Sequence, residues 1–186
     1  KVRRVIDRSG FSPVSHDGKA LLHILDTLPR DELFQIGERE LRDTALGILH
    51  LQERQRVALF VRRDPFGRYV SCLVYLPRDR YDTRLRRRIQ AVLETGFGGT
   101  VTAFYTQLTD EVLARLHFIV KTEPGVKPPQ SVEHIESGVV EAARDWNDDL
   151  AQALAAVHGE SAGVAMFESY RNAFPPAYRD RFLPAT

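Results

Sequence analysis

The hydrophobic pattern of this chain changes its period near residue 56, and this change most restricts the possible folds. Residues 56–63 (RVALFVRR) and 68–76 (RYVSCLVYL) alternate apolar with other side chains, a period of two that is typical of β-strands. Between them lie Asp64, Pro65, Phe66 and Gly67, with Asp, Pro and Gly at the first, second and fourth positions, as a type I turn favours. The pattern therefore predicts a β-hairpin.

A second pair of strands is predicted further along the chain. Residues 99–107 and 113–121 are rich in β-branched and aromatic side chains, and the polar stretch between them favours a turn. Residues 83–95 separate the two hairpins and carry apolar side chains at helical spacing, with Asp82 suited to the N-cap and Gly96 to the end of the helix. The predicted order is strand, strand, helix, strand, strand.

Helices are predicted on both sides of these strands in the sequence. Residues 17–28 carry a stripe of leucines behind Asp17, the expected N-cap, and residues 37–53 repeat apolar side chains at steps of three and four. Apolar residues then follow at heptad-like steps over 131–158, which predicts one long helix. A shorter helix is predicted around 163–173.

The order of these elements predicts an α+β fold with a four-stranded sheet. From residue 68 onwards the chain supplies strand, helix, strand, strand and helix, five of the six elements of the ferredoxin-like βαββαβ plan. The hairpin places residues 56–63 where the missing strand would lie, so the plan is a permuted ββαββα arrangement. We predict parallel central strands and helices on one face of the sheet. The predicted strand order is 56–63, 68–76, 113–121, 99–107.

Three regions are expected along the chain. They are a helical lead-in over 1–54, the sheet domain over 55–125, and a long helix with a C-terminal helical segment over 126–186. Because Met166 is the only methionine, we expect the chain to be a segment of a longer protein.

The composition limits the functional classes. The chain has 26 Lys and Arg against 25 Asp and Glu, so it carries no excess of basic charge for a polyanion. No apolar run approaches the roughly 18 residues of a membrane span, so we expect no membrane partner. The single cysteine, Cys72, excludes an internal disulfide framework and a paired-cysteine zinc site, and favours a reducing cytoplasm.

Isolated residues do not predict catalysis. Ser15, His16 and Asp17 contain the residue types of a catalytic triad, but triad members usually come from distant segments rather than consecutive positions. The six histidines show no metal-binding spacing, and His117 is expected to be a cross-strand surface side chain. Cys72 is expected in the core, with an inert thiol. We therefore predict no catalytic, cofactor-binding or metal site in this chain.

Glycines and arginines form two further clusters. Residues 96–99 (GFGG) lie between a helix and the following strand, the wrong end of a helix for cradling phosphates, so no nucleotide site is predicted. The arginines around residues 78–88 form either a solvated surface, a contact for an acidic partner, or a bidentate site for a carboxylate ligand. The candidate effector or partner contacts are Arg78, Asp79, Arg80, Tyr81, Arg84 and Arg87.

Several stretches resemble the large bacterial NAD-specific glutamate dehydrogenases. They are DELFQI (31–36), residues 56–89, WNDDL (146–150) and YRNAFP (170–175). The resemblance implies a position in the long N-terminal region of that family, with an ACT-like domain between helical motifs. It further implies that glutamate is oxidised to 2-oxoglutarate by a later domain of the parent, which would bind NAD. No catalytic residue can be carried over to this segment.

The resemblance also implies a role for the segment. ACT domains often bind amino acids near the loop after their first strand, which points to residues 77–83 (PRDRYDT) as a site for a small amino-acid effector. We expect a regulatory or assembly segment that contacts other domains and subunits of a cytoplasmic homo-oligomer.

Two alternative functions remain. One is a ligand-free structural spacer. The other is an RNA-recognition-like module, because such modules share the βαββαβ plan and FGRYV (66–70) loosely resembles their signature. That signature requires a basic residue and a glycine where Asp64 and Pro65 stand, so we expect no nucleic-acid partner.

Overall fold

The computed structural model of this chain describes residues 1–54, 56–109, 111–179, 181–182 and 184. The chain divides into two compact units, Lys1–Val140 and Glu141–Thr186. The first unit contains the sheet and the helices that pack on it. The second contains a helical segment.

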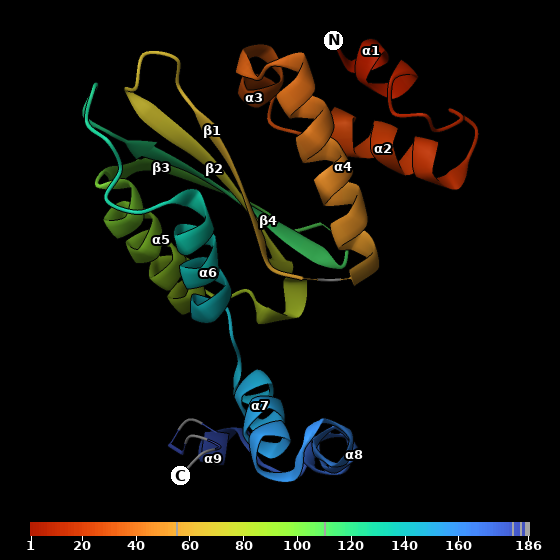
Figure 1. The fold of residues 1–186 in the computed structure, drawn as a ribbon, viewed down its shortest axis with the longest axis vertical. Helices are drawn as coiled ribbons and strands as arrows, with labels where there is room; N and C mark the ends of the chain where they lie inside the picture. Colours follow the sequence, from red (N-terminus) through yellow and green to blue (C-terminus); the bar gives the residue numbers. More distant parts are fainter. Residues whose placement is uncertain (55, 110, 180, 183, 185–186) are drawn as a thin grey trace. The chain divides into compact units, whose positions relative to one another are not determined.

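The first unit is built on a four-stranded sheet in the order β1-β2-β4-β3 (Figure 1). Its strands are β1 (Ala58–Arg63), β2 (Tyr69–Pro77), β3 (Thr100–Gln107) and β4 (Leu113–Lys121). All three neighbouring pairs are antiparallel. The predicted α+β class and strand order are therefore confirmed.

The prediction of parallel central strands is wrong. Strands β2 and β4 pair antiparallel, with Cys72 opposite Phe118. The helical crossover brings β3 back in the direction of β2, and the second hairpin then reverses the chain into β4. One crossover followed by one hairpin thus makes β4 antiparallel to β2.

The first hairpin closes as the turn residues predict. The Gly67 N–H donates to the Asp64 carbonyl at 2.9 Å, and Gly67 has φ +69°, a left-handed conformation that other residues rarely adopt. The Asp64 carboxylate accepts from the backbone N–H groups of Phe66 and Arg68 and from the Arg68 guanidinium. The guanidinium bond is the largest of the causes that lower the pKa of Asp64 to about 2.

Two helices, α5 (Thr83–Phe97) and α6 (Val132–Ala142), cover one face of the sheet (Figure 1). The buried side chains of this layer come from one face of each central strand and from the inner stripes of the helices. They include Cys72, Val74, Leu76, Leu116, Phe118, Val120, Leu85, Ile89, Leu93, Ile135 and Val139. Each large apolar side chain contributes about 1.5–3 kcal/mol when it is fully buried.

Helix α5 begins as predicted but ends later. The Leu85 N–H donates to the Asp82 carboxylate at 2.6 Å, which confirms the N-cap. The C-cap is Gly98, with φ +64°, rather than Gly96. Gly96 lies inside the helix because it packs on α6, where an added Cβ would lie 2.5 Å from Cγ1 of Ile135.

Four helices precede the sheet. They are α1 (Val2–Asp7), α2 (His16–Thr27), α3 (Arg30–Gln35) and α4 (Glu38–Arg54). The six-residue helices α1 and α3 were not predicted, because so short a segment shows little periodicity. Ser15 caps α2 by accepting the Gly18 N–H at 3.1 Å, so the prediction of Asp17 as the cap is wrong.

These N-terminal helices pack on the opposite face of the sheet (Figure 1). Helix α4 lies close to β1 at Gly47, where an added Cβ would lie 2.7 Å from Cε1 of Phe60. A second buried cluster joins helices α1 to α4 to the sheet. It includes Val5, Leu21, Ile24, Leu25, Leu41, Ala45, Ile48, Leu73 and Tyr75. Strand β2 is consequently buried on both faces from Val70 onwards.

The prediction of one long helix over 131–158 is wrong. Helix α6 ends at Ala142, and α7 (Trp146–His158) begins after Asp145. Asp145 has an extended backbone and forms a capping box, in which the Asp148 N–H donates to the Asp145 carboxylate and the reverse bond also forms. The capping box therefore begins a new helix at this point, although the heptad-like pattern of apolar residues continues through it.

The second unit contains α7, α8 (Glu160–Tyr170) and α9 (Pro176–Arg179). Gly163 lets α8 approach α7, because an added Cβ would lie 2.6 Å from Cα of Ala155. The Trp146 indole N–H donates to the Phe182 carbonyl at 2.7 Å. Aromatic side chains hold the end of the described chain on α7 through ring contacts among Trp146, Phe174, Tyr178 and Phe182.

Candidate functional site

The predicted contact residues follow one another along a loop and the start of a helix. Residues Arg78–Arg80 form the short helix η1 directly after β2, and Arg84 and Arg87 lie exposed, one turn apart, on α5. The Tyr81 hydroxyl lies 3.3 Å from Oγ1 of Thr106, which ties this loop to β3. The structure thus places all six residues on one continuous segment, and their role in contacting an effector or partner stays a prediction.

A buried polar cluster lies on the face of the sheet that the N-terminal helices cover. Its members come from α3, β1, β2 and β4, and each is at most 5% exposed. The cluster consists of Glu32, Arg62, Ser71 and His117. Buried charges are costly unless they are paired, so their partners determine whether this arrangement is stable.

Two parallel hydrogen bonds join the charged members of the cluster. Arg62 Nε donates to Glu32 Oε2 at 2.7 Å, and Arg62 Nη2 donates to Glu32 Oε1 at 2.7 Å. His117 Nε2 lies 3.6 Å from the same Oε1 and 2.8 Å from the Ser71 hydroxyl. A bidentate guanidinium–carboxylate pair of this kind is among the stronger polar contacts in proteins.

The surroundings keep the Glu32 carboxyl ionised. Burial by itself would raise its pKa, but the hydrogen bonds from Arg62, together with the neighbouring polar groups of His117 and Ser71, outweigh burial and lower the pKa to about 2. The bond to Glu32 in turn raises the pKa of the Arg62 guanidinium. Both partners are therefore charged across the neutral pH range.

The prediction that His117 is a surface side chain is wrong. It does point away from the apolar layer under α5 and α6, but α3 covers this second face with Glu32, and the Tyr105 ring lies 5.8 Å from the imidazole. One sequence signal could have revealed this burial. Phe60, Leu73 and Tyr75 make the second face of the strands partly apolar, which is typical of a sheet covered on both sides.

The other sequence candidates have structural roles. The Ser15 hydroxyl caps α2 and donates to the Ser12 carbonyl at 2.6 Å, so it has no triad geometry. Cys72 is fully buried, and desolvation raises the pKa of its thiol, which confirms the prediction of an inert core cysteine.

The glycines at residues 96–99 do not fit a dinucleotide. They lie at the carbonyl end of α5, whereas a pyrophosphate requires the N–H end of a helix. Gly99 is packed against β4, where an added Cβ would lie 2.2 Å from the Lys121 carbonyl oxygen. Close packing of the chain on itself therefore explains this cluster.

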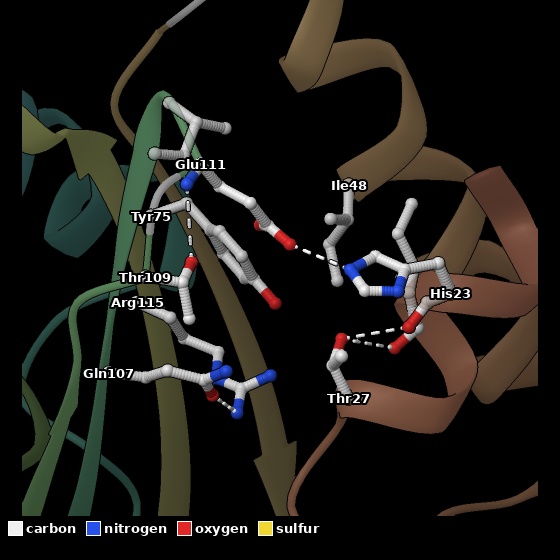
Figure 2. Close-up of a pocket in the computed structure, with 10 residues that line it drawn as sticks. His23, Thr27, Ile48, Tyr75, Gln107, Thr109, Glu111 and Arg115 are labelled. Atoms are coloured by element: carbon white, nitrogen blue, oxygen red, sulfur yellow. Dashed lines mark hydrogen bonds and ion pairs between the residues drawn. The ribbon is translucent and has the colours of Figure 1, made fainter.

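A small pocket lies between α2, α4 and the sheet (Figure 2). His23 Nε2 reaches Glu111 Oε1 at 2.8 Å across it, and Arg115 is hydrogen-bonded to Gln107 beside Tyr75. Its volume of about 20 Å³ is close to that of a single water position. The pocket thus has no room for an amino acid.

The described part of the chain offers neither a cluster of metal ligands nor a membrane-spanning helix. Within it, no group of three or more His, Cys, Asp or Glu side chains is arranged to hold a metal ion. Its helices all lack the combination of length and apolar character that crossing a bilayer needs.

Family models match almost every part of the chain. Residues 1–54 match "Glutamate dehydrogenase, helical motif 1", residues 58–147 match "Glutamate dehydrogenase, ACT2 domain", and residues 153–186 match "Glutamate dehydrogenase, helical motif 2". The chain belongs to the NAD-specific glutamate dehydrogenase family. The four-stranded sheet of the first unit lies within the region that matches the ACT2 domain of this family.

Curated members of the family are similar over the whole chain. The NAD-specific glutamate dehydrogenase of Halomonas elongata is 45% identical over 187 residues, which is 100% of this chain and 12% of that protein. The Pseudomonas aeruginosa enzyme is 40% identical over 99% of the chain and 11% of the relative. The Mycobacterium tuberculosis enzyme is 35% identical over 100% of the chain and 12% of the relative. The chain thus spans about an eighth of these relatives.

Proposed function

We propose that this chain is a non-catalytic regulatory and assembly segment of a cytoplasmic NAD-dependent glutamate dehydrogenase. In the parent, glutamate would be oxidised to 2-oxoglutarate and ammonium with NAD bound to another domain. The main support for the proposal is that the buried charges of Glu32 and Arg62 are paired with each other. Glu32 lies in the helical motif and Arg62 in the ACT-like sheet, and the two hydrogen bonds between them join these parts. They serve cohesion between elements rather than chemistry on a substrate.

The surface around η1 is the proposed contact for an effector or for a neighbouring subunit. Arg84 and Arg87 are exposed on α5, and guanidinium groups suit both carboxylates and acidic protein surfaces. The Tyr81–Thr106 contact positions the loop that precedes them. The geometry supports this surface as a contact site because its arginines are carried by a regular helix that is anchored in the core through Leu85 and Ile89.

Several observations count against the RNA-binding alternative. RNA-recognition modules stack bases on an open sheet face, whereas both faces of this sheet carry helices (Figure 1). In the FGRYV stretch, the Phe66 ring is covered by the Arg68 guanidinium at 4.9 Å, and Arg62 lies 5.7 Å from the Tyr69 ring centroid. These aromatic rings are in contact with the chain's own arginines.

Two assays test the proposal. The isolated chain, incubated with L-glutamate and NAD, is expected to give no NADH absorbance, and measurable turnover would overturn the non-catalytic assignment. In a full-length family member carrying this segment, Arg84→Glu with Arg87→Glu is expected to change the oligomeric mass or the response to amino acids. Lys19→Glu, an exposed site on α2, is the matched control. Unchanged mass and unchanged response would argue for a passive spacer.

A further inference from the structure

The donors and the acceptor of the buried cluster come from different kinds of element. Arg62, Ser71 and His117 project from β1, β2 and β4, three hydrogen-bonded strands of one sheet. The carboxylate comes from α3, a helix of only six residues. The donor groups are thus fixed by the sheet, whereas the anion is supplied by a short helix.

Helix α3 contacts the sheet through Glu32 and Gln35, and Leu33 and the C-cap Ile36 pack in the buried cluster that joins the N-terminal helices to the sheet. Its cap residues, Pro29 and Ile36, both have non-helical backbones, so it is not continued into α2 or α4. Gln35 accepts a hydrogen bond from the Tyr69 hydroxyl, and Phe34 points to solvent with 80% exposure. Glu32 is therefore the principal polar anchor of α3 on the sheet.

We propose that Arg62, Ser71 and His117 form a carboxylate-binding site on the sheet, which the Glu32 side chain fills in the native chain and which accepts a small free carboxylate once the Glu32 side chain is withdrawn. The bidentate guanidinium geometry is the one that proteins use to recognise carboxylates in general. The site differs from the η1 surface and does not depend on the proposed function.

The geometry predicts how the native chain responds to such a ligand. The Glu32 carboxylate belongs to the same chain, so it competes with a free carboxylate for Arg62 at a high effective concentration. A free carboxylate therefore binds the native chain only in the fraction of molecules in which α3 is detached. Removal of the Glu32 carboxylate leaves the donors in place without an anion. Binding should therefore be much tighter in a Glu32→Ala variant than in the native chain.

Acetate is the matched probe, because Glu32→Ala removes one methylene and one carboxylate. The thermal midpoint is measured in sodium acetate and in sodium chloride at equal ionic strength and pH 7. Acetate is expected to raise the midpoint of Glu32→Ala by about 3–5 °C in a saturable manner and to leave the native chain unchanged.

Arginine variants decide whether the effect belongs to this site. In the Glu32→Ala background, Arg62→Met is expected to abolish the acetate effect, whereas Arg63→Met, at the exposed neighbouring position, is expected to preserve it. An equal response of both double variants, or no response of Glu32→Ala, would overturn the proposal. If Glu32→Ala is unfolded in chloride, recovery of its native circular dichroism in acetate supports the site, and failure to recover overturns it.

Discussion

Glu32 of α3 and Arg62 of β1 form a bidentate ion pair with both hydrogen bonds at 2.7 Å, thirty residues apart in the sequence and almost entirely buried. This pair connects the helical motif to the ACT-like sheet. Because both charges are removed from water, each buried charge is stabilised only while its partner is present.

Removing both partners together is expected to cost less than the two single losses added together. Arg62→Met or Glu32→Leu leaves one buried charge unpaired, which destabilises by about 3–5 kcal/mol. The double variant replaces the pair by apolar side chains, so its loss should be smaller than the sum of the single losses by about 1–3 kcal/mol. Urea unfolding followed by circular dichroism measures the free energies of unfolding of the native chain, the two single variants and the double variant.

The control for this cycle is Arg63→Met, which changes an exposed arginine on the same strand. Its effect should stay within about 0.5 kcal/mol. Additive single losses would show that Glu32 and Arg62 do not interact in solution.

Acid should weaken the same pair. The pKa of Glu32 is lowered from 4.5 to about 2 in the folded chain, so its contribution to stability is fully present above pH 4.5 and is lost as the pH falls towards 2. The shift corresponds to about 3 kcal/mol. The difference in unfolding free energy between the native chain and Glu32→Gln should therefore shrink from pH 7 to pH 3.

The difference in unfolding free energy between the native chain and Glu32→Gln reports on the Glu32 carboxyl alone. Asp64 also has a lowered pKa of about 2, but it titrates in both proteins and cancels in the difference. A difference that stays constant between pH 7 and pH 3 would assign the stabilisation to something other than the ionised carboxylate.

Much of the sheet could be predicted because its signals are local. The turn chemistry of Asp64 and Gly67 and the N-cap Asp82 act within a few residues, and the structure uses each as expected. The break before Asp145 was missed because the capping box with Asp148 competes with an apolar pattern that continues past it.

The buried cluster could not be predicted because its members are joined by tertiary structure alone. Glu32 lies in a helix too short to show periodicity, and Arg62 is one of two consecutive arginines before a turn. Alternation places His117 on the side of β4 away from the apolar layer, but it cannot say that α3 covers that side. Charge patterns, in contrast, indicate the exposure of Arg84 and Arg87 on α5, while the contact role of these residues stays a prediction.

The thiol of Cys72 should report the opening of the first unit. It is fully buried in β2, and burial raises its pKa, so the native chain should react with a disulfide reagent far more slowly than the unfolded chain. Labelling rates measured from 0 to 4 M urea are expected to follow the unfolding of the sheet. Rapid labelling without urea would place the cysteine outside the core.

The first hairpin should depend on the backbone of Gly67. Gly67→Ala forces an L side chain to φ +69° and is expected to destabilise the chain by about 1 kcal/mol, while Gly67→Asn should cost less. Gly37→Ala is the control, because no atom lies within 4 Å of the added Cβ and its φ is not in the left-handed region. Equal stabilities of the two alanine variants would contradict the turn geometry.

The attachment of the helical motif to the sheet is tested most directly by hydrogen exchange of residues 30–36, followed by mass spectrometry, in the native chain and in Arg62→Met and Arg63→Met. Only Arg62→Met is expected to lose protection in this segment, while the peptides of β2 and β4 keep most of their protection. Equal protection of residues 30–36 in all three proteins would contradict the claim that the Glu32–Arg62 pair holds α3 on the sheet.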